Sequence, residues 1–433
     1  MAGTSLKTPT ALTSDTIAAP EQQSIASRRR PARQSRPQGT SAGVLITDGE
    51  ERSGVAACRV LRRAGYRVGV AASLRPAAAH WSRACEERFR VPDPCAEDAR
   101  FAEEIAAITA RGGFEVVMPA SDASMLALAR HRTAFDDGIV PGLPGPEVIE
   151  AAMRKADLHE KAARVGLAPP ETVLCETVED ARAAASDLGF PLLLKPRCSI
   201  FEQAGSLRQR GGFMVWDRES LERRLPEFGL PCLLQRRDGG RLISFAGVFA
   251  AGRLLAVVMS RYRRTWPADA GSVSYSETVA APEALCGRVS DLLSEMGWEG
   301  IFELELIQSG PAAYAAIDLN PRLYGSLALA VRAGVPLPAI WCDWLLEGKE
   351  RGGMAAPGFR YRWEDAELCN LFRHLRAGRI RDAATILRPR RRTAHALFRC
   401  NDPAPLLARV INVLRHPRSA LSPKPSTRQA ASR

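Results

Sequence analysis

Short apolar runs alternate with helically spaced apolar residues from Gly43 onward, and this pattern predicts alternating strands and helices. The run "GVLITDG" ends in a turn, and "GVAACRVLRRAG" carries apolar residues at helical spacing before a glycine stop. "YRVGVAAS" reads as a second strand, and "DARFAEEIAAITARGG" with "FEVVMPAS" repeats the helix and strand. Such β-α-β units imply a parallel sheet. We therefore expect a Rossmann-like domain over residues 43–145.

The pattern changes after the Pro/Gly-rich link "VPGLPGPEV". It predicts one helix over "EVIEAAMRKADLHEKAARVG", and further helices over "TVEDARAAASDLG", "DRESLERRL" and residues 282–296. Strands are expected at "FPLLLKP", "FMVW", "PCLLQ", "GIFELELI" and "AAIDLN", with a β-meander over "LISFAGVFAAGRLLAVVMSRYRR". Helices follow to about residue 350 and again over 363–387. The fold class is thus α/β in the first part and α+β in the second.

The first strand-helix turn lacks the usual nucleotide signatures. Gly49 and Gly54 flank this turn, but they complete neither a G-x-G-x-x-G fingerprint nor a Walker A loop. A Rossmann oxidoreductase is therefore disfavoured.

The net charge of +12 is located at the two ends of the 433-residue chain. Residues 1–42 carry +4 and residues 388–433 carry +10, whereas 43–387 carry −2. The Arg/Pro/Ser stretches at both ends cannot bury a core, so we predict solvated, disordered tails. Contact of these tails with an anionic partner stays open. We do not expect a nucleic acid, because no aromatic residues interleave with the basic ones.

Cysteine and hydropathy patterns point to a cytoplasmic protein. The ten cysteines form no CxxC pair, which argues against a zinc site and a disulfide framework. No uninterrupted apolar run approaches the length of a membrane span, and the first residues lack the apolar core of a secretory signal. The six histidines are dispersed, so helical or loop positions explain them better than catalysis does.

Charged residues interrupt several apolar strands. Lys195 ends "FPLLLK", and Glu303 and Glu305 share one face of "FELEL" because strand side chains alternate. Asp318 and Asn320 likewise share a face in "AAIDLNPRLYGSL". The short loop between the last two strands favours antiparallel pairing, which would bring Glu305 close to Asp318 and Asn320.

Two carboxylates and an amide oxygen form a hard, all-oxygen site. Such a site suits Mg²⁺, which keeps some waters and is completed by substrate phosphates. Arg322, two residues beyond Asn320, would then stabilise phosphoryl oxygens. The alternative is that these acids lie on an exposed sheet face and have no role.

The order of these motifs over residues 43–350 resembles the ATP-grasp superfamily, including the carboxylate–amine ligases and the ATP-grasp domain of the carbamoyl phosphate synthase large subunit. The matching residues are Lys155 in "AAMRKADLHEKAARVGLAPPET", Lys195 in "GFPLLLKPR", Gln235 and Arg236 in "PCLLQRRDGG", Arg264 in "RRTWPADAGS", Glu305 in "GWEGIFELEL", and Asp318, Asn320 and Arg322 in "IDLNPRLYGSL". The resemblance implies ATP binding by Lys155, Lys195, Gln235 and Arg236, metal binding by Glu305, Asp318 and Asn320, and catalysis by Arg322 and Arg264.

The resemblance also implies a domain layout. It comprises a basic tail (1–42), a Rossmann-like pre-ATP-grasp domain (43–145), an ATP-grasp domain (146–350) with a mobile lid at about 196–232, a helical C-terminal extension (351–416) and a second basic tail (417–433). The family usually has glutamate where Asp318 stands, and an acid where "QRRDGG" has arginines.

The function that the resemblance implies is an ATP-dependent ligase that forms C–N bonds. It would activate a small carboxylic acid as an acyl phosphate for attack by an amine, with Mg²⁺ or Mn²⁺, and release ADP and phosphate. The alternative is an ATP-binding sensor, or an inactive ATP-grasp module, whose basic tails contact an anionic partner.

Overall fold

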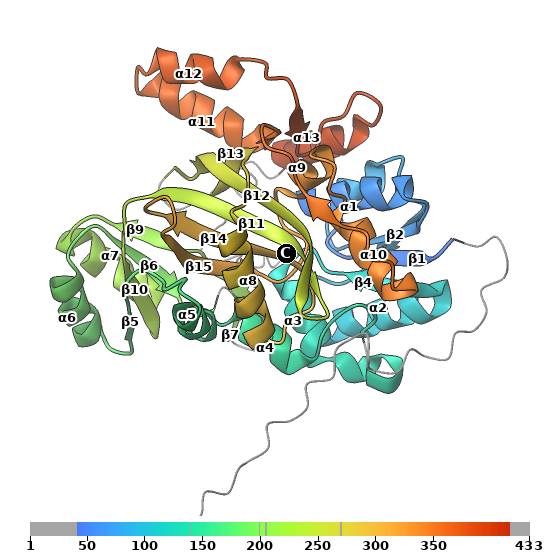
Figure 1. Cartoon of the computed structure of the whole chain (residues 1–433), viewed down its shortest axis with the longest axis horizontal. Coiled ribbons are helices and arrows are strands. Elements are labelled where there is room, and N and C mark those ends of the chain that lie inside the picture. The colour runs from blue at the N-terminus through green and yellow to red at the C-terminus, as the bar shows by residue number, and fades with distance from the viewer. Residues whose placement is uncertain (1–40, 139, 199, 204–205, 269–270, 416–433) are drawn as a thin grey trace, which may run out of the picture.

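The computed structural model of the chain describes residues 41–138, 140–198, 200–203, 206–268 and 271–415. Figure 1 shows mixed α/β architecture, with one sheet near each end of the molecule and a larger sheet between them. The two tails predicted from the sequence lie outside the described residues, apart from residues 41 and 42. In the described part of the chain, no helix combines the length and apolar character needed to cross a membrane.

The N-terminal sheet is parallel, as predicted, with strand order β3-β2-β1-β4. Its elements are β1 (Gly43–Ile46), α1 (Arg52–Arg63), β2 (Arg67–Ala72), η1 (Ala79–Trp81), β3 (Glu87–Arg90), α2 (Asp98–Gly112), β4 (Phe114–Met118), α3 (Asp122–Arg130), η2 (Arg132–Ala134) and η3 (Asp136–Gly138). The strand order reverses between β1 and β4, so the loops that follow these two strands open side by side at one edge of the sheet.

The single helix predicted over residues 147–166 is wrong, because the chain forms two helices there. They are α4 (Pro146–Met153) and α5 (Lys155–Arg164), and Arg154 between them has an extended backbone that bridges to Cys198. Apolar spacing runs unbroken through both helices, which is why the sequence pattern shows no boundary. The break places Lys155 at the first position of α5, although a lysine there opposes the helix macrodipole.

A four-stranded antiparallel sheet of order β5-β10-β6-β9 follows in the chain. Its elements are β5 (Thr172–Cys175), α6 (Val178–Leu188), β6 (Leu192–Pro196), β9 (Phe213–Val215), α7 (Arg218–Phe228) and β10 (Cys232–Arg236). Apolar residues of α6 and α7 pack with those of the strands in one buried cluster.

The segment predicted as a lid divides into two parts. Its later half contains β9, which is a strand of the four-stranded sheet, and α7, which packs against that sheet. Its earlier half is a separate hairpin of β7 (Ile200–Gln203) and β8 (Ser206–Gln209). Ile200 and Leu207 of this hairpin are buried against Ala123 and Leu126 of α3, so the hairpin contacts the N-terminal domain.

The central sheet has the order β15-β14-β11-β12-β13-β17-β18, and β16 pairs with β12. Its elements are β11 (Arg241–Ala250), β12 (Arg253–Trp266), β13 (Ser272–Thr278), α8 (Glu283–Glu295), β14 (Gly300–Gln308), β15 (Tyr314–Asn320), α9 (Leu327–Arg332) and α10 (Leu337–Glu347). The predicted meander is confirmed by β11 and β12, which turn at residues 251 and 252. One face packs on α4, α5 and α8, and apolar residues of the other pack with α1, α9 and α10.

The C-terminal segment contributes strands as well as helices. It contains β16 (Gly353–Met354), β17 (Arg360–Arg362), α11 (Glu364–Arg376), α12 (Ile380–Leu387), β18 (Thr393–His395) and α13 (Ala404–Arg415). β17 adds to β13 and β18 adds to β17, so this segment completes one edge of the central sheet. The helical extension predicted from the sequence is therefore only partly helical.

Candidate functional site

Two acids stand opposite each other on neighbouring strands of the central sheet. β14 and β15 pair antiparallel, as the short loop between them predicted. Glu305 lies opposite Asp318, and Glu303 lies opposite Asn320. The predicted approach of Glu305 to Asp318 is thus present in the structure, whereas Asn320 lies opposite Glu303.

We call Glu303, Glu305, Asp318 and Asn320 the acidic edge of the central sheet. Glu303 is its buried member. Its Oε1 accepts a hydrogen bond from Ser244 Oγ at 2.7 Å, and its Oε2 accepts one from Asn320 Nδ2 at 3.2 Å. Burial raises the pKa of Glu303, although these bonds favour the charged form. Sequence reasoning placed Glu303 on this face but gave it no role. The signal that could have found it is its period-two spacing from Glu305.

Glu305 is held by Tyr262 of β12, which sequence reasoning missed. Tyr262 Oη donates a hydrogen bond to Glu305 Oε1 at 2.9 Å. Burial, with the nearby charges of Glu303 and Asp318, raises the pKa of Glu305 to about 7. A bound cation would remove this penalty, because it favours the ionised carboxylate.

Lys155 supplies the opposite charge from the start of α5. Its Nζ lies 2.5 Å from Asp318 Oδ1, and the lysine side chain is buried. Burial alone would lower the pKa of Lys155, but the charge and hydrogen bond of Asp318, with the charges of Asp122 and Glu305, together outweigh burial and raise it. The break between α4 and α5 therefore delivers a paired, buried ammonium to the acidic edge.

Lys195 reaches the site from the four-stranded sheet. Its Nζ donates to Gln235 Oε1 at 2.6 Å, and Gln235 Nε2 donates to Thr172 Oγ1 at 2.8 Å. Burial, followed by the like charge of Lys155, lowers the pKa of Lys195 to about 8. Neighbouring strands β6 and β10 thus hold Lys195 and the buried Gln235 together.

Arg236, the residue after Gln235, is exposed at the end of β10. Its guanidinium pairs with Glu171 at 2.7 Å and with Asp238 at 3.0 Å. It is thus paired with surface acids, whereas Gln235 bonds Lys195.

Arg322 is fixed by groups from two domains. Its Nε pairs with Asp122 at the start of α3, its Nη1 donates to Leu323 O at 3.0 Å, and its Nη2 donates to Asn320 Oδ1 at 3.0 Å. Sequence reasoning missed Asp122, which lies 200 positions away in the chain. Because Asp122 belongs to the N-terminal domain, this ion pair couples that domain to the acidic edge.

The structure does not bring Arg264 to the acidic edge. Its Nε donates to Glu367 Oε1 of α11 at 3.0 Å, and its guanidinium lies over the ring of Tyr275. The register of β12 against β13 shifts on either side of Arg264. Because of these shifts, the side chain of Arg264 points in a different direction from that of Tyr262.

A polar cleft of about 650 Å³ opens beside these residues. The lining residues come from the loops after β1 and β4 and from the central sheet: Glu51, Arg52, Ser53, Ala120, Ser121, Asp122, Tyr262, Ser272, Val273, Glu303, Glu305, Asn320, Arg322, Gly325 and Ser326. The guanidinium of Arg52 is positioned by the Gly325 carbonyl, 3.0 Å from its Nε, and by the ring of Trp363 beneath it. The cleft therefore combines cationic, anionic and hydroxyl groups.

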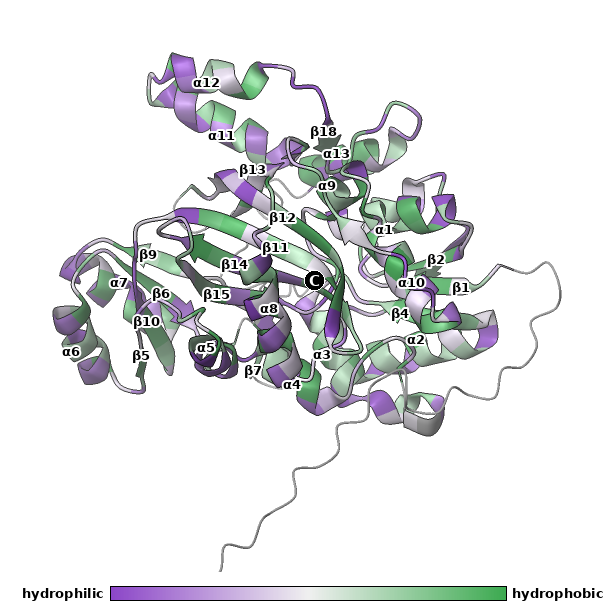
Figure 2. Ribbon diagram, in the orientation of Figure 1, coloured by the Kyte–Doolittle hydropathy of each residue, from purple (hydrophilic) through white to green (hydrophobic). Residues whose placement is uncertain are grey.

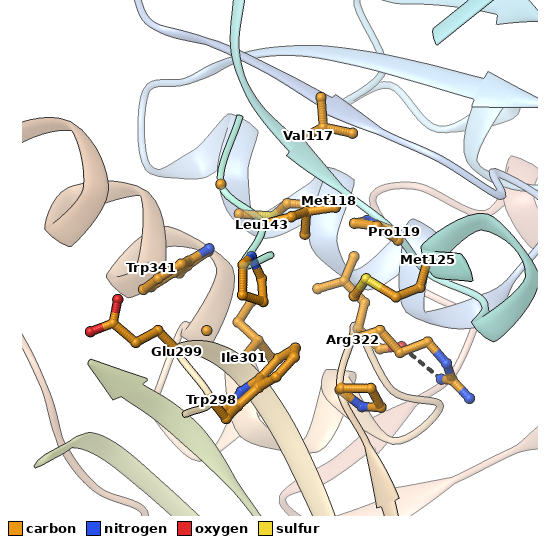
Figure 3. Close-up of a pocket in the computed structure, with 15 residues that line it drawn as sticks. Val117, Met118, Pro119, Met125, Leu143, Trp298, Glu299, Ile301, Arg322 and Trp341 are labelled. Carbon is orange, nitrogen blue, oxygen red and sulfur yellow. Dashed lines mark hydrogen bonds between the residues drawn. The ribbon is translucent and has the colours of Figure 1, made fainter. Parts of the chain in front are cut away.

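A smaller cavity, of about 310 Å³, shares Arg322 with this cleft. Figure 3 shows that its other labelled residues are mainly apolar, including Leu143, Met125, Trp298 and Trp341, and that the guanidinium of Arg322 points away from them. The apolar cavity thus contacts the first part of Arg322, and its guanidinium points toward the polar cleft.

No family model matches the chain, but curated relatives cover part of it. The carbamoyl phosphate synthase large chain of a Thermus thermophilus strain is 26% identical over 209 residues, which is 45% of this chain and 20% of that one. The enzyme of the same name from Pasteurella multocida is 27% identical over 168 residues, 36% of this chain and 14% of that one. The match therefore spans a fifth or less of these relatives.

Solved structures resemble most of the chain. The N5-carboxyaminoimidazole synthetase of Staphylococcus aureus with ADP has a TM-score of 0.56 at 12% identity and covers 72% of this chain and 79% of that one. Biotin carboxylase from Campylobacter jejuni (TM-score 0.54, 15% identity) covers 71% of both chains. The L-amino acid ligase of Bacillus licheniformis (0.52, 15%) covers 71% of this chain and 74% of that one.

The chain has the ATP-grasp fold. The resemblance inferred from the sequence is thus confirmed at the level of the fold. Lys195 of the four-stranded sheet lies close enough to Glu305 and Asp318 of the central sheet for their charges to act on it.

The oxygen donors of this ATP-grasp chain fit a magnesium ion that is shared with phosphates. Among the described residues, no three aspartate, glutamate, histidine or cysteine side chains converge as a closed metal site. Glu305 and Asp318 with the amide of Asn320 supply the hard ligands of an open site, in which Mg²⁺ keeps waters or binds phosphate oxygens.

Proposed function

We propose that the chain is an ATP-dependent ligase that activates a small carboxylic acid as an acyl phosphate and joins it to an amine. The observation that carries this proposal is the convergence of Lys155 and Lys195 with Glu305, Asp318 and the Asn320–Arg322 pair. Ammonium groups beside an oxygen-donor edge match the charges of a metal-bound triphosphate.

In this proposal Lys155, Lys195, Gln235 and Arg236 bind ATP. Glu305, Asp318 and Asn320 would hold Mg²⁺, or Mn²⁺ in its place, which supplies charge neutralisation to the phosphates when bound. Residues 43–145 act as the pre-ATP-grasp domain and residues 146–350 as the ATP-grasp domain.

The reaction would follow in two displacements. An oxygen of the substrate carboxylate attacks the γ-phosphorus, and the bond to the ADP oxygen breaks. The amine nitrogen then attacks the carbonyl carbon of the acyl phosphate, phosphate leaves, and the nitrogen loses a proton. Arg322, fixed in the cleft by Asp122 and Asn320, stabilises the charge on the transferred phosphoryl group.

Arg264 has a different role in this proposal from the catalytic one that the resemblance implied. Its bonds to Glu367 and its contact with Tyr275 support a positioning role between β12 and α11.

Three neighbours support this reaction class by what their names state. One is an L-amino acid ligase, one is a carboxyaminoimidazole synthetase with ADP bound, and one, the biotin carboxylase domain of Hydrogenobacter thermophilus 2-oxoglutarate carboxylase, holds MgADP and bicarbonate.

The proposal is tested by ADP release from Mg-ATP in the presence of a panel of small carboxylic acids, with hydroxylamine to trap the acyl phosphate. Lys195→Met should reduce acid-dependent ADP release at least ~100-fold, because it removes a buried ammonium from the phosphates. Lys161→Met is the matched control, since Lys161 is a half-buried lysine of α5 whose Nζ bonds Glu295 O, away from the acids of β14 and β15. It should retain activity within about twofold. Nucleotide binding without ADP release for any acid would instead assign an ATP-binding module.

A further inference from the structure

Exposed apolar side chains are concentrated on the last three α-helices. They are Leu368, Phe372 and Leu375 of α11, Ile380 and Leu387 of α12, and Leu407, Val410 and Leu414 of α13. The five of α11 and α12, two helices that pack as one hairpin, we call the C-terminal apolar surface. Phe372 is 62% exposed, Ile380 71% and Leu414 75%. These eight make up half of the large exposed apolar residues in the described part of the chain, so they are not random scatter.

The core does not need this surface. On α11, Ala366, Asn370 and His374 are buried at helical spacing and form the face toward the body. The exposed Leu368 and Phe372 follow a separate helical row, because they are displaced from the buried row by two positions. α11 therefore has one apolar row more than its packing requires.

α12 is held at the periphery by a small contact. Ala383 and Ile386 are its buried residues, and Ile380 and Leu387 are exposed. Figure 1 shows the α11–α12 hairpin projecting beyond the body, and Figure 2 shows apolar segments on both of its helices. α13 contacts the start of α11 through Arg409, whose Nε lies 2.6 Å from Asp365 Oδ2.

The residues around this surface are strongly basic. Residues 373–392 contain eight arginines and one acid, Asp382. The acids at the start of α11 are already paired: Glu364 accepts from the backbone of Phe398, Asp365 binds Arg409, and Glu367 binds Arg264. The surplus arginines therefore dominate the electric field beside the apolar rows.

We propose that the C-terminal apolar surface binds an anionic lipid membrane without crossing it. Apolar rows flanked by basic residues are typical of helices that lie in the membrane interface. The arginines would contact lipid phosphates, while their long side chains extend past the apolar rows to reach them.

Charge and shape disfavour other occupants. Residues 1–40 and 416–433, which the structure does not describe, are themselves net positive and would be repelled. A second copy would set two arginine-rich hairpins against each other across a twofold axis. A nucleic acid would use the arginines but leave the leucines in water. A lipid bilayer can adapt its surface to the projecting α11–α12 hairpin. An acidic protein would instead need a groove whose shape fits the hairpin.

The test is sedimentation of the full chain with vesicles of phosphatidylcholine, with or without phosphatidylglycerol. Binding should require phosphatidylglycerol and weaken with salt. The double variant Phe372→Ser/Ile380→Ser should bind at least ~10-fold more weakly, because it removes apolar insertion. Leu174→Ser, which alters an exposed residue of β5, is the control and should bind as the unaltered chain does. Thermal unfolding checks that each variant remains folded.

Three outcomes would overturn the proposal. They are no sedimentation with phosphatidylglycerol vesicles at low salt, equal binding by the double variant, and concentration-dependent dimerisation that Phe372→Ser abolishes. Binding to an acidic amphipathic peptide or to duplex RNA, with none to vesicles, would also do so by assigning another partner. The experiment contains no nucleotide, so its result is independent of the proposed ligase activity.

Discussion

Asp318 holds the buried Lys155 in place and also stands where the resemblance noted in the sequence leads us to expect a glutamate. In the proposed site it must share its carboxylate between Lys155 and a metal ion. Its 2.5 Å contact with Lys155 Nζ shows that the shorter side chain still reaches the lysine.

Changing the charge at this position should matter more than changing its length. Asp318→Asn should lower acid-dependent ADP release at least ~100-fold, because it removes a metal ligand and the acid that pairs with Lys155 at 2.5 Å. Asp318→Glu should retain activity within about tenfold. Measured kcat/KM for ATP distinguishes these outcomes, and equal losses in both variants would contradict the argument.

Lys195 should make ATP binding depend on pH. Its pKa of about 8 means that it is charged below this pH and increasingly neutral above it. Phosphates favour the charged form, so binding above pH 8 should take up a proton, and affinity should fall by about tenfold per pH unit.

Titration calorimetry in buffers of different ionisation enthalpy measures this uptake. Lys195→Arg is the control, because arginine stays charged throughout. The same proton uptake in that variant would assign the titration to another group.

The sequence predicted the residues of the acidic edge, but not the residues that bond to them and to Arg322. Alternation along two strands identified Glu305, Asp318 and Asn320, because a loop of a few residues leaves little choice but antiparallel pairing. Tyr262 and Asp122 could not be found in this way, since they come from other strands and domains. Arg264 was assigned to catalysis by motif alone, and the register shifts in β12 decide its direction.

At the scale of elements, one buried ion pair joins α1 to the loop before α13. Arg59 Nε lies 2.8 Å from Asp402 Oδ2, and Arg59 Nη2 also donates to the carbonyls of Leu397 and Asp402. Ser82 Oγ donates to the same carboxylate at 2.7 Å. The C-terminal loop is thereby fastened to the N-terminal domain.

Asp402→Ala should reduce the free energy of unfolding by about 3–5 kcal/mol, because it leaves a buried guanidinium without its partner. Asp382→Ala, at a mainly exposed acid of α12, should cost less than about 1 kcal/mol. Denaturant unfolding measures both, and similar values for the two variants would contradict the prediction.

Asp402 should also contribute to acid sensitivity. Burial raises its pKa, but bonds from Ser82 and Arg59 outweigh burial and lower it. Because the folded-state pKa is depressed, the stabilisation is present above pH 3.8 and is lost as the pH falls through the folded value. Comparison of unfolding at pH 7 and pH 3 should therefore show a smaller loss for Asp402→Ala than for the unaltered chain.

Long elements were predictable and short ones were not. The β11–β12 meander and α8 carry enough periodic residues to be recognised. β17 is "RYR" and β18 is "TAH", so neither shows a strand pattern. Their conformation is fixed by pairing, of β17 with β13 and of β18 with β17. The apolar pattern likewise gives no sign of the boundary between α4 and α5.

At the scale of the whole molecule, the ATP-grasp sheet includes strands from beyond the matched motifs. A chain ending at residue 350 would expose the edge of β13 and leave Arg59 and Arg264 without their carboxylates. We expect this truncation to lose cooperative thermal unfolding. A chain ending at residue 415 keeps these contacts and should unfold as the full chain does. Cooperative unfolding of the 1–350 chain would contradict this expectation.

The bond between Arg59 and Asp402 also constrains when the protein can mature. Arg59 leaves the ribosome long before Asp402 is synthesised, so during the interval it has neither this carboxylate nor the carbonyls of Leu397 and Asp402 that bind it. The N-terminal domain therefore reaches its final packing only near the end of synthesis, although domains commonly fold in the order of translation. A nascent chain halted shortly before residue 402 should remain sensitive to proteases in its first domain.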